Sequence, residues 1–183
     1  MSVFLFNLPN VQMNNHKMDS KQSEKIQFRP IQIEDSAELA VLIRSVLKEH
    51  GADKPGTVYT DPTTDSLFEL FQTEGSFYWV ALKEQEIIGG CGIFPTLGLP
   101  DKCVELVKLY VSKSSRGTGI GYKLIEICLQ HAKEAGYSSV YLETLPELSK
   151  AAGLYAQMGF QKLIKPMGNS GHFACDLWML KEI

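Results

Sequence analysis

The sequence lacks any hydrophobic run long enough to cross a membrane. No apolar stretch reaches the roughly 18 residues that a membrane-spanning helix needs. The apolar segment at residues 1–9 has no basic region before it and no small-residue cleavage site after it, so we do not interpret it as a signal peptide. These features predict a protein with no membrane partner.

An excess of positive charge is also missing. Lys and Arg total 18 and Asp and Glu total 21, which gives a formal net charge of -3. This balance argues against a nucleic-acid partner held mainly by phosphate neutralisation, although it leaves a local basic patch open. The hydrophobic fraction of 44% and the charged fraction of 21% exclude extensive disorder, and 183 residues fit one domain.

Cysteine is scarce, with four residues and no C-x-x-C pair. We expect reduced, mostly buried thiols, which points to the cytoplasm. His172 and Cys175 form an H-x-x-C pair, but residues i and i+3 of a strand point to opposite faces of a sheet. We therefore predict no metal site.

The first 24 residues differ in composition from the rest of the chain. Asn, Gln, Ser and Lys dominate residues 10–24 without a sustained period, which indicates a loosely ordered extension at residues 1–24. Met18 in this extension is a candidate alternative start of translation. The domain itself is predicted at residues 25–183.

Hydrophobic periodicity predicts the strands and helices of this domain. One helix is expected to start at Asp35, with this side chain and Glu38 as a capping box, and to end at Gly51. Three consecutive strands with short links indicate an antiparallel meander. The prediction is an α+β domain with one mixed sheet, with strands at 26–31, 77–82, 87–94, 104–111, 139–144, 161–164 and 173–180, and further helices near 67–71, at 119–135 and at 147–158.

A glycine-rich loop, R-G-T-G-I-G at residues 116–121, joins the strand at 104–111 to the next helix. Glycine allows positive φ and close approach of a ligand, and the first N–H groups of a helix have no internal partner. Together with the helix dipole these groups form an anion site. Tyr122 stands where a dinucleotide fingerprint or a P-loop needs its next glycine, which disfavours a nucleotide-binding oxidoreductase.

The loop resembles the pyrophosphate loop of the GCN5-related N-acetyltransferases, R/Q-x-x-G-x-G/A, at Arg116, Gly119 and Gly121. The segment L-Y-A-Q-M-G-F at residues 154–160 resembles the L-Y-x-x-x-G-F helix end of the same family, and the order of elements over residues 25–183 is also similar. The resemblance implies a mixed, mostly antiparallel sheet flanked by about four helices. It also implies that the fourth and fifth strands, here 104–111 and 139–144, splay apart.

The same resemblance implies acetyl-CoA as co-substrate. Tyr110 and Val111 would pair with its pantetheine arm through main-chain groups, and a main-chain N–H near Tyr110 would polarise the thioester carbonyl. The side chain of Arg116 either contacts phosphate or only caps the loop. The pyrophosphate would be held by the amides of Arg116, Gly117, Thr118, Gly119, Ile120 and Gly121.

The implied reaction moves an acetyl group to a primary amine by direct attack in a ternary complex, and it needs a base and an acid. Glu105 is the candidate base because a carboxylate in an apolar strand is costly unless it is used or paired. The alternative is an outward-facing partner of Lys102 or Lys108. Tyr155 is the candidate acid near the coenzyme sulfur, and the alternative is an ordinary core tyrosine.

The acceptor is a small-molecule or peptide amine whose identity the sequence leaves open. The resemblance assigns its selection to residues 52–73 and 165–171. The acidic side chains Asp53, Asp61 and Asp65 in the first segment either favour a cationic amine or are the ordinary charges of a solvated loop. His172 either touches the substrate or lies on the surface. A non-catalytic CoA-binding sensor is the alternative function, and family members often form homodimers.

Overall fold

A computed structural model describes residues 25–183, so the predicted extension and the start at Met18 lie outside the described residues. Within this range the observed order of strands and helices agrees with the order predicted from sequence. The elements are β1 (Ile26–Pro30), α1 (Asp35–Glu49), η1 (Val58–Thr60), η2 (Pro62–Asp65), α2 (Leu67–Leu70), β2 (Phe77–Lys83), β3 (Glu86–Phe94), β4 (Cys103–Val111), η3 (Lys113–Ser115), α3 (Ile120–Glu134), β5 (Ser139–Thr144), η4 (Pro146–Leu148), α4 (Ser149–Gln157), β6 (Gln161–Leu163) and β7 (Leu177–Glu182).

One seven-stranded sheet organises the domain, with strand order β1-β2-β3-β4-β5-β7-β6. All neighbouring strands are antiparallel except β4 and β5, which are parallel. The expected α+β fold with a mixed, mostly antiparallel sheet is therefore confirmed.

The parallel pair β4–β5 is short. Cys103, Val104 and Glu105 of β4 pair with residues 139–141 of β5, and the pairing stops there although both strands continue. Beyond Glu105 the two strands diverge, which confirms the expected splay. Backbone and side-chain groups past this point are free to face a ligand rather than a neighbouring strand.

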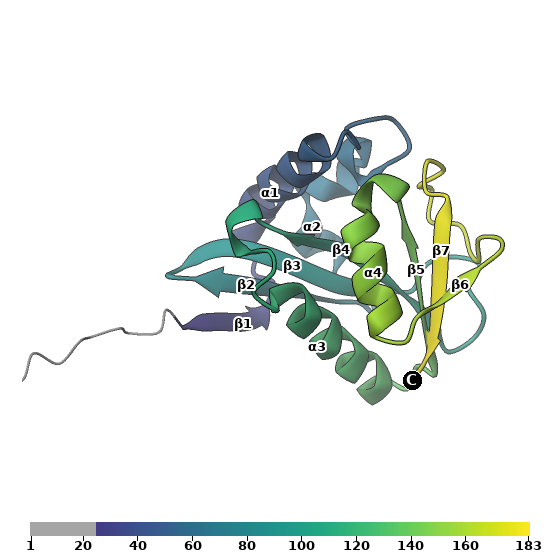
Figure 1. Ribbon diagram of the computed structural model, residues 1–183. Coiled ribbons are helices and arrows are strands. Elements are labelled where there is room, and N and C mark those ends of the chain that lie inside the picture. The colour runs from purple at the N-terminus through teal and green to yellow at the C-terminus, as the bar shows by residue number, and fades with distance from the viewer. Residues whose placement is uncertain (1–24) are drawn as a thin grey trace, which may run out of the picture.

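Helices cover both faces of the sheet. Figure 1 shows α3 and α4 in front of the strands and α1 and α2 behind them. Each face has its own buried hydrophobic cluster, one built around α3 and the other around α1. Within residues 25–183, no helix combines the length and apolar character that a bilayer crossing requires.

The predicted capping box of α1 is wrong. Glu34 occupies the N-cap position and makes no side-chain cap hydrogen bond. The carboxylate of Asp35 instead pairs with Arg29 of β1 at 2.6 Å, and Glu38 accepts a hydrogen bond from the backbone N–H of Ile87 in β3 at 3.0 Å. Both carboxylates therefore fasten the helix to the sheet.

The last strand begins later than predicted. It starts at Leu177 rather than at Phe173, whose side chain is 81% exposed. The apolar residues at 173–175 belong to the loop between β6 and β7, where the N–H of Ala174 bonds to the carbonyl of Gly56 at 3.1 Å. This contact brings the loop onto the segment between α1 and α2, where it contributes to the site described below.

Candidate active site

The glycine-rich loop enters α3 through two left-handed residues. Gly117 has φ 77° and Gly119, the N-cap of α3, has φ 87°. A Cβ built at either position meets no atom within 4 Å, so the need for glycine here is conformational rather than steric.

The loop presents a run of unused hydrogen-bond donors. Among the hydrogen bonds of residues 25–183, none uses the backbone N–H groups of residues 116–122 as donors. The first internal bonds of α3 are donated later, beginning with Lys123 to the carbonyl of Gly119 at 3.0 Å. Seven adjacent N–H groups at the positive end of a helix dipole fit an anionic diphosphate.

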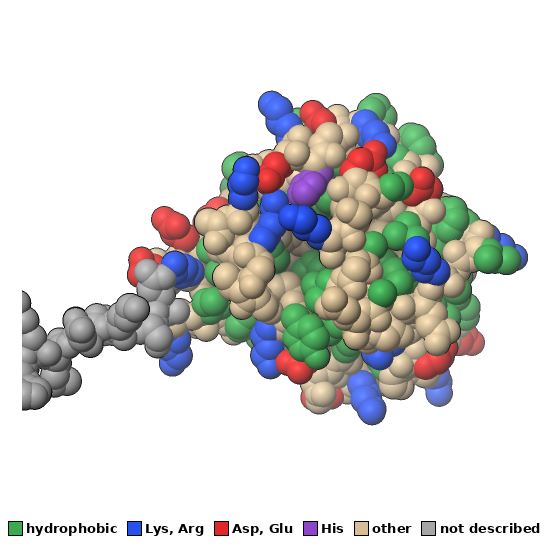
Figure 2. Space-filling model, in the orientation of Figure 1, with side chains coloured by type: hydrophobic (Ala, Val, Ile, Leu, Met, Phe, Trp, Pro, Cys, Tyr) green, Lys and Arg blue, Asp and Glu red, His purple; other side chains and the backbone are tan. Residues whose placement is uncertain are grey.

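The side chain of Arg116 is engaged elsewhere. Its Nε donates to the carbonyl of Val111 at 3.0 Å, and its two terminal nitrogens donate to the carboxylate of Glu49 at 3.0 and 2.9 Å. Arg116 therefore fastens the loop to the last residue of α1, while its main-chain N–H remains among the unused donors. Figure 2 shows this face of the molecule, where basic side chains gather beside a histidine.

Strand β4 carries a bulge where it leaves β5. Lys108 and Leu109 together oppose Cys91 of β3, and Lys108 adopts φ 51°. The hydroxyl of Tyr78 donates to the carbonyl of Lys108 at 3.0 Å, and the Tyr78 ring fills the space where a Cβ on Gly90 would lie 2.6 Å from it. The glycine in β3 thus makes room for the ring that holds the bulge in place.

Two cavities adjoin at this bulge. The larger, of about 480 Å³, lies between residues 56–63, β4 and the loop at 169–173. The smaller, of about 70 Å³, occupies the splay between β4 and β5 and reaches α4. Their common wall contains Thr57, Glu105, Val107, Lys108 and His172.

Glu105, the predicted base, is buried in this common wall and only 3% exposed. Burial raises the pKa of its carboxyl to about 7, a hydrogen bond from the hydroxyl of Thr96 opposes the rise, and the charge of Glu143 adds to it. Its hydrogen-bond partner is Thr96, so the alternative of an outward-facing partner for Lys102 does not fit this geometry.

Tyr155, the predicted acid, lines the smaller cavity together with Glu105 and Tyr110. It projects from α4, is buried, and its ring packs edge-on against Phe160 with centroids 5.8 Å apart. Burial raises the pKa of its phenol well above the usual range, so the hydroxyl keeps its proton at neutral pH.

Asp61, Lys108 and His172, which the sequence analysis named separately, form a cluster around the buried side chain of Lys108. The Nζ of Lys108 lies 2.8 Å from the carboxylate of Asp61, and the Nε2 of His172 lies 3.3 Å from the same oxygen. Burial opposes ionisation of Asp61, but the hydrogen bond with His172 and the charge and hydrogen bond of Lys108 outweigh it and lower the pKa well below its usual range.

This cluster changes the expected role of the acidic side chains. Asp61 is neutralised by Lys108, and Asp65 pairs with Arg44 at 2.5 Å, so neither carboxylate is free to attract a cationic amine. In the sequence, Lys108 stands out as a lysine inside an apolar strand. The same kind of observation, a carboxylate in an apolar strand, identified Glu105.

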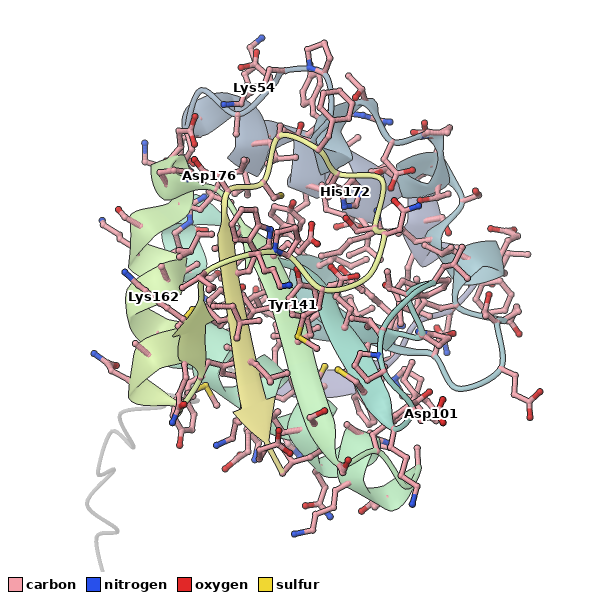
Figure 3. All side chains as sticks on the ribbon, turned by 90° about the vertical axis from the view of Figure 1, so that its right-hand side faces the viewer. Lys54, Asp101, Tyr141, Lys162, His172 and Asp176 are labelled. Carbon is pink, nitrogen blue, oxygen red and sulfur yellow. The ribbon has the colours of Figure 1, made fainter. Side chains whose placement is uncertain are left out.

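The loop between β6 and β7 is anchored to β5. Glu143 accepts hydrogen bonds from the hydroxyls of Tyr141 and Ser170, both at 2.8 Å, and the Tyr141 hydroxyl accepts from the N–H of Met167 at 3.2 Å. Figure 3 shows this loop across the face of the sheet, with His172 on it and Tyr141 on the strand beneath. Residues 169–173 of this loop line the larger cavity.

Comparison with known proteins agrees with this arrangement. A family model described as the Acetyltransferase (GNAT) family matches residues 43–160. The chain belongs to this family. It is 37% identical over 158 residues to the uncharacterized N-acetyltransferase YjgM of Escherichia coli K12, a match that covers 85% of this chain and 94% of that protein. The GNAT member described here is therefore an acyltransferase.

More distant relatives share part of the chain or the fold. Human N-acetyltransferase 8 is 36% identical over 118 residues, which span 61% of this chain and about half, 52%, of that protein. An acetyltransferase of the GNAT family from Staphylococcus aureus Mu50 has a TM-score of 0.77 at 22% identity and covers 86% of this chain and 99% of its own. The PaiA N-acetyltransferase from Thermoplasma acidophilum, solved in complex with coenzyme A, has a TM-score of 0.64 at 17% identity and covers 87% of this chain and 99% of its own.

We predict that Glu49→Ala weakens the binding of coenzyme A by about 2- to 10-fold, because the loop loses the contact that preorders its N–H groups. Isothermal titration calorimetry measures the effect. Glu134→Ala, at the far end of α3, removes the same charge away from the loop and serves as the control. Tighter binding by Glu49→Ala would contradict the prediction. It would mean that the negative charge of Glu49 repels the coenzyme more than its contact with Arg116 orders the loop.

A second prediction concerns stability. The folded protein holds a proton on Glu105 up to pH about 7, whereas the unfolded chain releases it near the ordinary carboxyl pKa. This stabilisation is complete below the unfolded pKa and is lost as the pH rises toward 7. The free energy of unfolding of Glu105→Gln minus that of the wild type should therefore grow by roughly 3 kcal/mol between pH 4 and pH 8.

Urea denaturation across this pH range tests the prediction. Glu69→Gln, which makes the same change at an exposed position, provides the control. Parallel pH curves for Glu105→Gln and the wild type would show that the Glu105 carboxyl ionises in the fold as it does in the unfolded chain.

Proposed function

We propose that the protein transfers the acetyl group of acetyl-CoA to a primary amine of a small molecule or peptide by direct attack in a ternary complex. One observation carries the proposal. The carboxyl of Glu105, which is buried and has a pKa of about 7, lies in the wall between two cavities. One cavity is at the splayed strands, and the other lies between residues 56–63 and the loop at 169–173.

The smaller cavity suits the thioester arm. It lies between the diverging ends of β4 and β5, where an extended arm can pair with main-chain groups in the manner of an added strand. Tyr110 lines it, and Val111 connects it to the loop through its bond with Arg116. The unused N–H groups of residues 116–122 supply the diphosphate site at its outer end.

The larger cavity suits the acceptor, and Glu105 faces both substrates from the wall between them. An amine attacks only in its neutral form, so a base must take a proton from it during the reaction. A carboxyl whose pKa lies near the operating pH is half-ionised there and serves this purpose best. A non-catalytic CoA sensor has no use for such a residue, which costs stability at neutral pH.

Tyr155 supports the proposal from the opposite side of the smaller cavity. A thiolate leaving group needs a proton or a hydrogen-bond donor. The raised pKa of Tyr155 weakens it as a proton donor but keeps its hydroxyl protonated, so Tyr155 acts by donating a hydrogen bond to the departing sulfur. Tyr155 lies on α4, and its buried phenol lines this cavity. Because burial raises the pKa of the phenol, the hydroxyl hydrogen stays available for donation.

We predict that kcat/KM of the wild type rises with pH through about 7, because Glu105 must be ionised to accept the proton. Glu105→Gln should lower kcat/KM by roughly 100-fold or more and remove this limb. Thr96→Val deletes the hydrogen bond that favours the ionised carboxyl, so the limb should move to higher pH.

Steady-state rates from pH 5.5 to 9, expressed as kcat/KM per neutral amine, measure these changes. Thr73→Val loses a threonine hydroxyl that lines neither cavity and bonds to the backbone carbonyl of Leu70, and it should leave the pH profile in place. If kcat/KM of Glu105→Gln still rises through pH about 7 as in the wild type, Glu105 is not the base.

A further prediction concerns Tyr155→Phe. This change should lower kcat by roughly 100-fold or more and alter the Kd for coenzyme A little, because the hydroxyl acts on the departing sulfur rather than in binding. Tyr137→Phe, which loses a hydroxyl bonded to the carbonyl of Gly75, is the matched control. Unchanged turnover in Tyr155→Phe would exclude this role of its hydroxyl.

A further inference from the structure

The ammonium group of Lys108 is buried and has more N–H donors than the hydrogen bond it makes. Its side chain is 4% exposed and lines both cavities. An ammonium has three N–H donors, and within residues 25–183 the carboxylate of Asp61 is the only acceptor within hydrogen-bond distance of this nitrogen. The remaining donors suit an oxygen atom of a bound molecule or of water.

Lys108 and Glu105 face the same space although they are three residues apart on one strand. In a regular strand such residues point to opposite faces of the sheet. The bulge at Lys108 changes its direction, so that the carboxyl and the ammonium line the common wall and interact electrostatically. A single acceptor molecule can therefore contact Glu105 with its amine nitrogen and Lys108 with another atom near that nitrogen.

Two large apolar side chains lie at the exposed edge of the larger cavity. Leu97 and Phe173 both line it, and their side chains are 78% and 81% exposed. Deeper in, Leu70, Phe94 and Val107 line the same cavity. Large exposed hydrophobic side chains at the rim of a pocket mark the place where an apolar part of a ligand binds.

We propose that the acceptor is an α-amine with a carbonyl or carboxylate oxygen on the adjacent carbon and an apolar side chain. This inference rests on the proposed function and specifies its substrate class. The amine faces Glu105, the neighbouring oxygen accepts a hydrogen bond from Lys108, and the side chain extends toward Leu97 and Phe173.

The charges of the site disfavour other amines. A diamine or polyamine brings a second cation toward Lys108, where like charges repel. Asp61 is paired with Lys108 and His172 and offers such a cation no free carboxylate. A simple arylalkyl amine fits the apolar edge of the cavity but leaves the spare donors of Lys108 without a partner from the substrate.

The test compares four acceptors with the full chain and acetyl-CoA. L-Phenylalaninamide carries the amine, the neutral oxygen and the apolar side chain. L-Phenylalanine replaces the amide by a carboxylate, 2-phenylethylamine lacks the oxygen, and glycinamide lacks the apolar side chain. The product is quantified by mass spectrometry, and kcat/KM is expressed per neutral amine because the four amines differ in pKa.

We expect at least one of the two phenylalanine derivatives to exceed both 2-phenylethylamine and glycinamide by at least tenfold. A preference for the amide indicates the N-terminus of a peptide, and a preference for the free carboxylate indicates a free amino acid. Equal rates for 2-phenylethylamine and both phenylalanine derivatives, or acetylation of polyamines alone, overturn this inference and leave the acetyltransferase function intact. Acetylation of no amine in a broad panel overturns the proposed function itself.

The double variant Lys108→Met/Asp61→Asn removes the buried ion pair as a unit, which avoids leaving one charge unpaired. It should reduce the preference for the better phenylalanine derivative over 2-phenylethylamine to about one, whereas Lys102→Met, an exposed lysine just before β4, should retain it. A preserved preference in the folded double variant contradicts the role of Lys108. If the double variant does not fold, the ratio in the wild type decides the substrate class on its own.

Discussion

The early end of pairing between β4 and β5 is the constraint on which the site depends. Three residues of each strand pair, and after Glu105 the two backbones separate. Buried backbone groups that lose a ladder partner need another one or must face a ligand. The smaller cavity fills this gap, and the larger cavity adjoins it across Glu105 and Lys108. The divergence thus creates the smaller space and places one carboxyl between it and the larger cavity.

The polar groups between the two cavities differ in how well the protein compensates their charge. Lys108 and Asp61 neutralise each other at 2.8 Å, so this buried pair is electrostatically balanced. Among residues 25–183, the hydroxyl of Thr96 is the one hydrogen-bond partner of the Glu105 carboxyl, and the charge of Glu143 further raises its pKa. The folded state is therefore destabilised at neutral pH by the same environment that makes Glu105 a base of suitable strength.

Local features of the site could be predicted from sequence, and features set by tertiary contacts could not. The positive φ of Gly117 and Gly119 and the unused N–H groups follow from a glycine-rich turn into a helix, which needs no knowledge of the rest of the fold. Glu105 was identified because a carboxylate is unusual in an apolar strand. Lys108 was named only as an alternative ion-pair partner of Glu105. Its place in the same wall depends on the bulge, because regular strand alternation puts residues 105 and 108 on opposite faces.

Contacts between distant segments account for the other differences. Asp35 was expected to cap its own helix, but it binds Arg29 of β1, six residues earlier, at 2.6 Å, and this contact forms only because the chain turns back between β1 and α1. Arg116 matched a phosphate-loop motif, yet its guanidinium is bound by Glu49, 67 residues earlier in the chain. The motif identified the loop because its glycines allow the positive φ angles of the turn. The contacts of the Arg116 side chain depend instead on Glu49, which packs beside it.

Helix α1 connects the two halves of the site. Glu49 at its end holds the anion loop through Arg116. One turn earlier, Arg44 donates to the carbonyl of Tyr59 at 3.3 Å and to Asp65 at 2.5 Å, which holds the segment that forms one wall of the larger cavity. Because both attachments lie on one helix that packs against β3 and β4, a single rigid element sets the distance between the donor and acceptor sides. The spacing of the two substrates therefore depends on this helix as much as on the residues that touch them.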